Sequence, residues 1–313
     1  MPGSYDTLIS APELALAVSR REVRVIDCRA SLSDPEAGIR EFRAGHIPGA
    51  QHADLERDLS GPGSPGNGGR HPLPERTLLA QRFRHWGING TSQIVCYDDT
   101  GGAFAARFWW LARWLGHSSV AVLDGGLGFW LEQAGNSLEL GDSTPLPSGN
   151  FTAASPLTRQ IDAKALLNLI QPDPSDSICL IDARGRERFD GSKEPIDPVA
   201  GHIPGALCLP FTDNLQLAPT ATTPPSQSPL QPGCFKSQAT LRSQFESILD
   251  PHQRAICYCG SGVTATHHVL ALKRAGFPEA TLYPGSWSEW IENPERPTQP
   301  PRSLRKSHTA APE

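Results

Sequence analysis

The amino-acid sequence predicts an α/β protein of two homologous domains, each a mostly parallel sheet with helices on both faces. The first observation behind this prediction is an internal repeat, because Gly45-His-Ile-Pro-Gly-Ala50 returns letter for letter as Gly201-His-Ile-Pro-Gly-Ala206. The second is the alternation of short apolar runs with longer helical patterns in both copies, which is typical of parallel α/β sheets. The length of 313 residues agrees, since a domain usually has about 100–200 residues.

Further segments match between the two halves in the same order. The matched pairs are Val25–Arg29 with Leu180–Arg184, Ile94–Tyr97 with Ala255–Tyr258, and Gly116, Gly125 and Trp130 with Gly276, Gly285 and Trp290. Their spacing is several times that of a solenoid repeat, so it indicates a duplicated domain. We therefore expect a first domain at 4–135, a linker at 136–155, a second domain at 156–292 and a disordered tail at 293–313.

Each copy begins with a capped helix. Ser10-Ala-Pro-Glu13 is a capping box in front of the helical run Leu14–Val18, and Asp162 is the expected cap of Ala163–Ile170. The expected strands are 23–27, 93–97, 178–182 and 255–258, and further helices are expected at 76–86, 238–248 and 265–274. Ligands of such sheets bind beyond the carboxyl ends of the strands, so the residues after Tyr97 and Tyr258 are candidates for the site.

Glycine and proline are in excess, with 29 and 30 residues, and they concentrate in a few segments. Residues 60–69 form an expected flexible loop, and 133–156 contain the linker. Residues 215–233 hold five prolines without a helical period, which indicates a mobile insertion in the second copy.

The composition excludes several classes of protein. A net charge of -5 argues against a nucleic-acid-binding surface. The N-terminus lacks the basic and apolar regions of a signal peptide, and the apolar run Phe104–Leu115 is interrupted by Arg107 and Arg113, so no membrane span is expected. The seven cysteines form no Cys-x-x-Cys pair, which excludes a zinc ribbon or thioredoxin motif. We expect a soluble, cytoplasmic monomer without nucleic-acid or membrane partners.

A candidate nucleophile follows the last strand of the second copy, where the sequence reads Cys259-Gly-Ser-Gly-Val-Thr264 before a helix. Gly260 and Gly262 allow backbone conformations that turn successive N–H groups inward, and the helix adds the positive end of its dipole. Such a cradle binds an anion and lowers the pKa of a thiol at its centre, so Cys259 is expected to react as a thiolate. The alternative is a buried cysteine at an ordinary tight turn.

The first copy has Asp98 where the second has Cys259, in the stretch Asp98-Asp-Thr-Gly-Gly-Ala103. A carboxylate is no sulfur nucleophile, and its charge is expected to oppose an anion in the cradle. The first copy is therefore predicted to be noncatalytic. Cys96 and Cys257 match across the copies inside strands and are expected to be core residues.

The repeated turns, the altered first loop and Cys-Gly-Ser-Gly-Val-Thr-Ala together resemble the two-domain rhodanese family over about residues 4–292. The uncharged loop is similar to that of the 3-mercaptopyruvate sulfurtransferase branch, whereas thiosulfate sulfurtransferases carry basic residues after the cysteine. The resemblance implies that Cys259 takes sulfur from a donor as a persulfide. It also implies that a thiophilic acceptor, such as cyanide, a small thiol or thioredoxin, then receives it. It implies no metal or organic cofactor.

The resemblance also implies donor-binding residues. Arg188 matches the family arginine that holds the anionic end of the donor, and Arg184 matches a second arginine at the strand end. The loop residues Gly260, Gly262, Val263 and Thr264 would bind the transferred sulfur. Lys193 stands alone where mercaptopyruvate enzymes supply another arginine, which leaves thiosulfate open as the main donor.

The same branch places Ser261 beside a histidine and an acid from the first domain, in a relay that could polarise the donor. His71 matches the histidine and Glu56 the acid, with Asp54 as a competitor. His46 and His202 occupy equal positions in both copies and are expected to close the turns. Two other classes remain as alternatives: a sulfur-carrier module loaded by a partner protein, and a cysteine phosphatase, which would need an arginine at the end of the loop.

Overall fold

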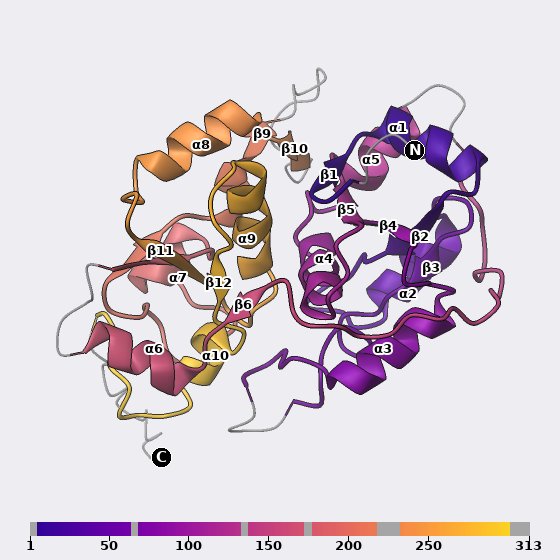
Figure 1. The fold of residues 1–313 in the computed structure, drawn as a ribbon. Coiled ribbons are helices and arrows are strands. Elements are labelled where there is room, and N and C mark those ends of the chain that lie inside the picture. The colour runs from indigo at the N-terminus through magenta and orange to yellow at the C-terminus, as the bar shows by residue number, and fades with distance from the viewer. Residues whose placement is uncertain (1–4, 64–67, 133–136, 172–176, 218–231, 301–313) are drawn as a thin grey trace, which may run out of the picture.

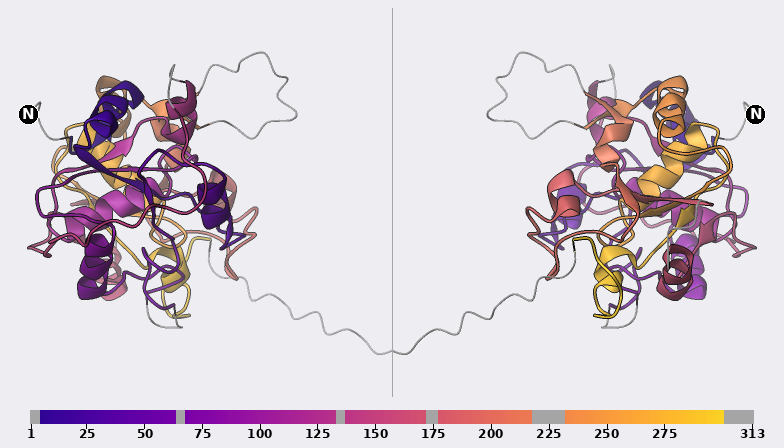
Figure 2. Two further views of the ribbon diagram at one scale, coloured as in Figure 1. Left: turned by 90° about the vertical axis from the view of Figure 1, so that its right-hand side faces the viewer. Right: turned by 90° about the vertical axis from the view of Figure 1, so that its left-hand side faces the viewer.

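The computed structural model describes residues 5–63, 68–132, 137–171, 177–217 and 232–300. They form two domains that lie side by side in Figure 1. In the views of Figure 2, turned by 90° from Figure 1, one domain lies in front of the other.

Each domain is built on a five-stranded parallel sheet, and the two sheets have the same strand order. The first sheet runs β1-β5-β4-β2-β3, and the second runs β6-β12-β11-β7-β8. The strands of the first are β1 (Leu8–Ile9), β2 (Val23–Asp27), β3 (Gln51–His52), β4 (Gln93–Tyr97) and β5 (Val120–Leu123). Those of the second are β6 (Arg159–Gln160), β7 (Ile178–Asp182), β8 (Ala206–Cys208), β11 (Arg254–Tyr258) and β12 (Thr281–Leu282). The predicted α/β fold is confirmed.

The helices also follow the expected pattern, with ends that differ from it by up to three residues. The first domain holds α1 (Ala11–Ser19), α2 (Ala37–Ala44), α3 (Arg76–His85), α4 (Ala105–Trp114) and α5 (Gly126–Glu132). The second holds α6 (Ala163–Ile170), α7 (Arg186–Asp190), α8 (Gln238–Glu246), α9 (Ala265–Arg274), α10 (Ser286–Trp290) and the 3-10 turn η1 (Phe211–Asn214). The expected cap of α6 is formed, since Asp162 Oδ1 accepts the N–H of Ala165 at 2.7 Å. Such a cap stabilises a helix by about 1 kcal/mol.

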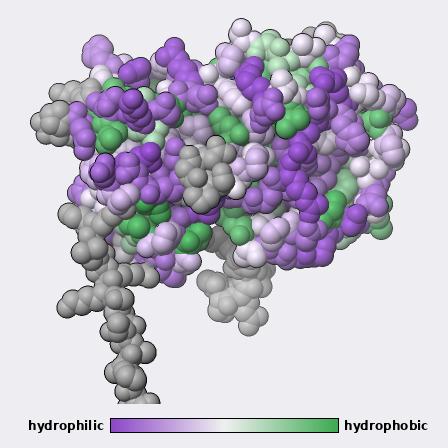
Figure 3. Space-filling view, turned by 90° about the horizontal axis from the view of Figure 1, so that it is seen from below, coloured by the Kyte–Doolittle hydropathy of each residue, from purple (hydrophilic) through white to green (hydrophobic). Residues whose placement is uncertain are grey.

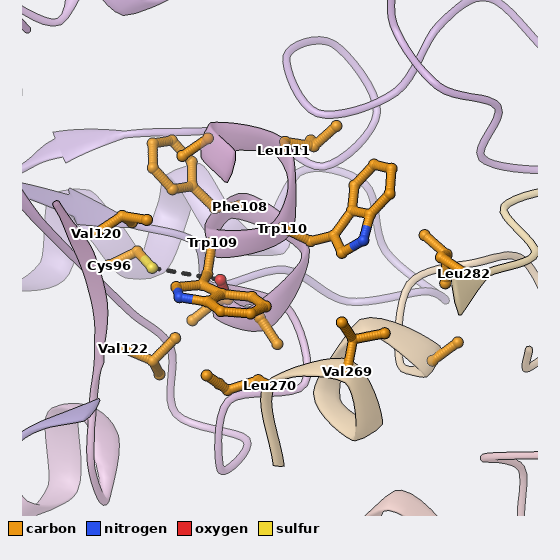
Figure 4. Packing of buried hydrophobic residues seen from close by; sticks show 14 of the residues in the cluster. Cys96, Phe108, Trp109, Trp110, Leu111, Val120, Val122, Val269, Leu270 and Leu282 are labelled. Atoms are coloured by element: carbon orange, nitrogen blue, oxygen red, sulfur yellow. Dashed lines mark hydrogen bonds between the residues drawn. The ribbon is translucent and has the colours of Figure 1, made fainter. Parts of the chain in front are cut away.

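Helices α4 and α9 lie between the two sheets and form the domain interface. All 10 residues of α4 are buried, including Arg107 and Arg113. In Figure 4, Trp109 and Trp110 of α4 face Val269 and Leu270 of α9. One hydrophobic cluster runs from the first sheet through both helices into the second domain. The outer faces have separate clusters, with α1 and α5 on the first sheet and α6 and α10 on the second.

A buried polar network joins the start of α9 to its surroundings. The side-chain amide Nδ2 of Asn214 lies 3.1 Å from Nδ1 of His267 and 2.9 Å from Nδ1 of His268. Nε2 of His267 lies 3.0 Å from the carbonyl oxygen of Gly101, in the first domain, and Nε2 of His268 lies 2.6 Å from that of Leu209. The network therefore ties α9 to the loop of the other domain.

The described part of the linker is ordered along the first domain. Glu139 and His46 exchange backbone hydrogen bonds of 2.9 and 2.8 Å, and the N–H of Gly149 donates to Arg84 at 2.8 Å. Phe151 is buried. The linker is thus a packed strap.

Two of the irregular segments differ from expectation. The ends of the expected insertion pair as an antiparallel hairpin, β9 (Leu215–Leu217) with β10 (Pro232–Phe235), while 218–231 lie outside the described residues. The tail is expected to be disordered from residue 293, but its first residues are packed in the structure. Trp290 Nε1 donates to the carbonyl of Pro297 at 2.8 Å, and Gln299 exchanges backbone hydrogen bonds with His202, so 293–300 pack on the second domain. Residues 64–67 of the expected flexible loop and 301–313 of the tail lie outside the described residues.

The outer surface is mainly hydrophilic on the face drawn in Figure 3, where hydrophobic residues form small separate patches. Among the described residues, no helix combines the length and the hydrophobicity needed to cross a bilayer.

Candidate active site

The candidate nucleophile Cys259 lies directly after β11, the central strand of the second sheet, at the carboxyl end of that strand. The backbone of the turn is fixed from behind by the start of α10. The N–H of Cys259 donates to Ser286 Oγ at 3.0 Å, and its carbonyl accepts from the N–H of Trp287 at 3.0 Å. The carbonyl of Gly260 accepts from Ser288 at 2.9 Å. Because the C=O and N–H of a trans peptide point in opposite directions, the N–H groups of Gly260 and Ser261 point away from α10.

The loop leaves backbone donors open. Within the described part of the chain, none of the N–H groups of residues 260–264 donates to a protein acceptor. Gly262 makes this path possible, because its φ is +77° and a Cβ there would lie 2.0 Å from the carbonyl oxygen of Pro284. Cys259 and Val263 are each 2% exposed, and α9 begins at Ala265. Unpaired N–H groups at a helix start form an anion-binding cradle.

The matching loop of the first domain has its cradle filled. The Asp98 carboxylate, 1% exposed, accepts four backbone N–H groups at 2.8–2.9 Å, from Thr100, Gly102, Phe104 and Ala105. The Asp98 charge is predicted to oppose an anion in the cradle; in the structure the carboxylate is itself the bound anion. The loop is also one residue longer, with 99–104 before α4 against 260–264 before α9. Both differences support the prediction that the first copy is noncatalytic.

Ser261, His71 and Glu56 form a continuous chain of hydrogen bonds. Ser261 Oγ lies 2.6 Å from His71 Nδ1, and His71 Nε2 lies 2.8 Å from Glu56 Oε1. The hydrogen bond to His71 lowers the pKa of Glu56. Asp54, the competitor, instead accepts the backbone N–H groups of Glu56 and Arg57 at 2.9 and 2.8 Å, so it holds the turn that presents Glu56.

Arg107 of α4 connects this chain to the cradle from below. Its guanidinium is fully buried, and it donates to the carbonyls of Gly262 and His71 at 3.1 Å each. Burial lowers the pKa of Arg107 to about 10, and the nearby Cys259 opposes that shift. Sequence reasoning noted Arg107 only as an interruption of an apolar run. A fixed positive charge beneath the cradle stabilises an anion within it.

Of the two predicted donor-binding arginines, Arg188 faces the loop and Arg184 does not. Arg184 is 3% exposed, and its guanidinium pairs with Asp182 at 2.7 Å and with the carbonyl of Gly201 at 2.6 Å. Arg29 in the first domain pairs in the same way with Asp27 and Gly45. We therefore correct the prediction: Arg184 holds the repeated turn in place and has no free face for a donor.

Arg188 lies on α7 with its guanidinium directed toward Gly260. A Cβ on Gly260 would lie 3.4 Å from both Nη atoms of Arg188. The same Cβ would lie 2.9 Å from Nη2 of Arg70, a residue of the first domain that sequence reasoning missed. Its position next to His71 was the available signal. Lys193 is exposed and pairs with Glu187 at 3.9 Å, so it does not serve the loop.

The six cysteines outside the cradle lie in surroundings that disfavour a thiolate. Burial raises the pKa of the thiols of Cys28, Cys96, Cys179, Cys208, Cys234 and Cys257. Such thiols stay protonated at neutral pH and are poor nucleophiles.

His46 and His202 have the same role in both copies. Nδ1 of His46 lies 2.8 Å from the carbonyl oxygen of Phe42, and Nδ1 of His202 lies 2.7 Å from that of Phe189. Each imidazole also stacks on that phenylalanine. The expected structural role in the turns agrees with this geometry.

Comparison with known proteins gives a consistent set of similarities. A family model described as "Rhodanese-like domain" matches residues 10–133 and 162–293. The chain is 47% identical over 298 residues to a Pseudomonas aeruginosa protein named "Probable 3-mercaptopyruvate sulfurtransferase", covering 94% of this chain and 98% of that protein. It is 31% identical to the thiosulfate sulfurtransferase of Rattus norvegicus, covering 92% of each. The crystal structure of SseA from Escherichia coli, described as a 3-mercaptopyruvate sulfurtransferase, has a TM-score of 0.73 at 32% identity, covering 90% of this chain and 99% of that one.

Proposed function

The chain belongs to the rhodanese family, with two rhodanese-like domains, and on that premise we propose that it is a sulfurtransferase that uses Cys259. The preferred donor is 3-mercaptopyruvate, and thiosulfate is the second candidate. The observation that carries the proposal is the open cradle: in the described part of the chain, the five N–H groups of residues 260–264, which directly follow Cys259, have no acceptor, whereas the matching cradle is filled by Asp98.

In the first step the Cys259 thiolate attacks the sulfur of the donor. A sulfur–sulfur bond forms, the donor's carbon–sulfur bond breaks, and the electron pair of that bond stays on carbon as the enolate of pyruvate. The product on the enzyme is the persulfide anion of Cys259. The N–H groups of 260–264 and the charge of Arg107 stabilise that anion, because fixed dipoles act most strongly where water is excluded.

The proton of the donor thiol moves through the chain of Ser261, His71 and Glu56. The Glu56 carboxylate accepts from Nε2–H of His71, which leaves Nδ1 free to accept the proton that Ser261 passes on. After the carbon–sulfur bond breaks, the same proton returns to the enolate and completes pyruvate. The relay therefore neither gains nor loses a proton over the step.

In the second step a thiol acceptor, either a small thiol or a thioredoxin-type protein, attacks the outer sulfur and releases the Cys259 thiolate. A thiolate nucleophile survives best in a reducing compartment, so we propose that the protein works in the cytoplasm.

Intact-mass spectrometry tests the proposal. Incubation with excess 3-mercaptopyruvate should add the mass of one sulfur atom, and a thiol should remove it. The Cys259→Ser variant should add none, while Cys208→Ser, at a half-buried cysteine away from the cradle, should react like the parent. If neither 3-mercaptopyruvate nor thiosulfate adds sulfur to the parent protein, the proposal is wrong.

A further inference from the structure

A cavity of about 300 Å³ lies in the second domain, at the opposite end of β11 from the cradle. It is bounded by α6 and by the outer face of the strands β6, β12 and β11, all of which are labelled in Figure 1. Two arginines, Arg159 and Arg254, line it together with the apolar side chains of Ile161, Leu169 and Ile256. An apolar lining with a few polar groups is typical of small-molecule sites.

Strand register brings the two arginines to the same face of the sheet. Thr281 of β12 pairs with Arg159 of β6 on one side and with Ile256 of β11 on the other. Partners in register point to the same face, and so does Arg254, because it lies two residues before Ile256. Ile256 is 2% exposed and belongs to the outer hydrophobic cluster that includes α6. The two arginines therefore lie beside an apolar floor.

The charges of the cavity are uncompensated. Within the described residues, the guanidinium groups of Arg159 and Arg254 make no hydrogen bond and no ion pair. Arg242, another exposed arginine of the same domain, by contrast pairs with Glu246 at 2.9 Å. The lining residues of the cavity include no carboxylate. A guanidinium group presents its donors in a planar fork that matches a carboxylate, so the cavity suits a carboxylate ligand.

The first domain shows what occupies the equivalent place in the other copy. Gln93, the first residue of β4, corresponds to Arg254, and its side-chain amide accepts the N–H of Tyr5 and donates to the carbonyl of Tyr5, both at 3.0 Å. The Tyr5 ring packs on the outer cluster of that domain. Counted back from α1 and α6, the counterpart of Tyr5 is Leu157. Leu157 is 40% exposed, and its N–H donates to Arg113 of α4, so the second cavity is left open.

We propose that this cavity binds a small carboxylic acid that carries one aromatic ring. An arginine in place of the Gln93 amide suits a carboxylate in place of the Tyr5 peptide group, and that exchange turns the tyrosine skeleton into a 3-arylpropanoate. Arg254 binds the carboxylate, Arg159 adds a second positive charge, and the apolar floor contacts the ring. The site lies at the other end of β11 from the cradle, so binding there goes beyond the proposed sulfur transfer and needs none of its chemistry.

Isothermal titration calorimetry of the full chain with 3-(4-hydroxyphenyl)propanoate tests the proposal. The matching propanamide is the neutral control ligand of nearly the same shape. The propanoate should bind at least tenfold more tightly than the propanamide, because only the propanoate makes the charge-assisted contact. Arg254→Gln should weaken binding of the propanoate about tenfold and remove this preference, and Arg254→Lys should restore part of it. The matched control is Arg242→Gln, at an exposed arginine outside the cavity, and it should bind the propanoate like the parent.

Two more variants complete the test. Leu169→Trp fills the cavity without changing its charge and should weaken binding of both ligands, which keeps the proposal testable if Arg254→Gln does not fold. Arg188→Gln, beside the cradle, should leave binding of the propanoate unchanged. Equal affinities for the two ligands, no binding of the propanoate at millimolar concentration, or unweakened binding in Leu169→Trp would overturn the proposal. Binding that persists in Arg254→Gln and is lost in Arg188→Gln would also overturn it, because the propanoate would then occupy the cradle. None of these measurements involves sulfur transfer, so they fail or succeed independently of the proposed function.

Discussion

Acidification from pH 7 to pH 5 should destabilise the folded protein through the paired histidines at the start of α9. His267 and His268 are fully buried, and Asn214 donates to Nδ1 of each, so both imidazoles are held in the neutral form. A proton on Nδ1 would face the Asn214 amide, donor against donor. Burial lowers the pKa of His267 to about 3 and that of His268 to about 4.

The sign and size of the effect follow from proton linkage. In the unfolded chain both histidines return to a pKa of about 6.5. Below that pH the unfolded state binds two protons that the folded state does not, so the free energy of unfolding falls as the pH falls. Between pH 7 and pH 5 each histidine accounts for about 2 kcal/mol, and the pair for about 4 kcal/mol. The decline ends once the pH passes below the lowered pKa values of the folded state.

Urea unfolding at pH 7, 6 and 5 measures this dependence. His268→Gln keeps a side-chain N–H for the carbonyl of Leu209 and removes one titrating group. The loss of unfolding free energy between pH 7 and pH 5 should therefore shrink by about 2 kcal/mol, whatever the stability of the variant at pH 7. His252→Gln, at an exposed histidine outside this network, is the control and should keep the dependence of the parent. Equal slopes in the parent and in His268→Gln would refute the reasoning.

Three further changes test other contacts of the site. Asp98→Ala leaves four buried N–H groups without an acceptor and should lower the free energy of unfolding by about 4 kcal/mol or more in urea, at 1–3 kcal/mol for each group; a loss below about 1 kcal/mol would contradict the filled-cradle assignment. Arg107→Met should slow alkylation of Cys259 by iodoacetamide at pH 7 about tenfold, because it removes the buried charge beneath the cradle. Arg107→Lys should recover part of the rate. Equal alkylation rates in both variants and the parent would exclude an effect of the Arg107 charge. Glu56→Gln should lower kcat with 3-mercaptopyruvate about tenfold. In the parent, the lowered pKa of Glu56 should keep its carboxylate ionised, and the relay intact, down to pH values below about 4.5. A loss of activity near pH 6 that is absent in Glu56→Gln would contradict this role of the Glu56 carboxylate.

The sequence predicts the duplicated fold well because the signals are local or repeated. Strand positions follow from short apolar runs, and the two copies check each other. The chain of Ser261, His71 and Glu56 was predicted through the family resemblance, and the structure brings the three side chains together. Their roles in catalysis remain predictions for the experiments above.

Contacts that cross the domain interface could not be predicted in the same way. Arg107 donates to Gly262, and Arg70 approaches Gly260, yet no periodicity links residues so far apart in the chain. The error at Arg184 has a different cause. The pair Asp182 and Arg184 repeats Asp27 and Arg29 of the noncatalytic copy, so comparison of the two copies already contained the signal for a structural role.

Because both domains contribute residues to the site, the rate of turnover should depend on how closely the two domains are packed together. The cysteine and its cradle come from one domain, while His71, Glu56, Arg70 and the buried Arg107 come from the other. Loosening of the α4–α9 contact would separate these groups before either sheet unfolds. A low concentration of denaturant should therefore abolish sulfur transfer while circular dichroism still reports intact secondary structure. Neither half of the polypeptide contains a complete reaction centre, although each contains a complete fold.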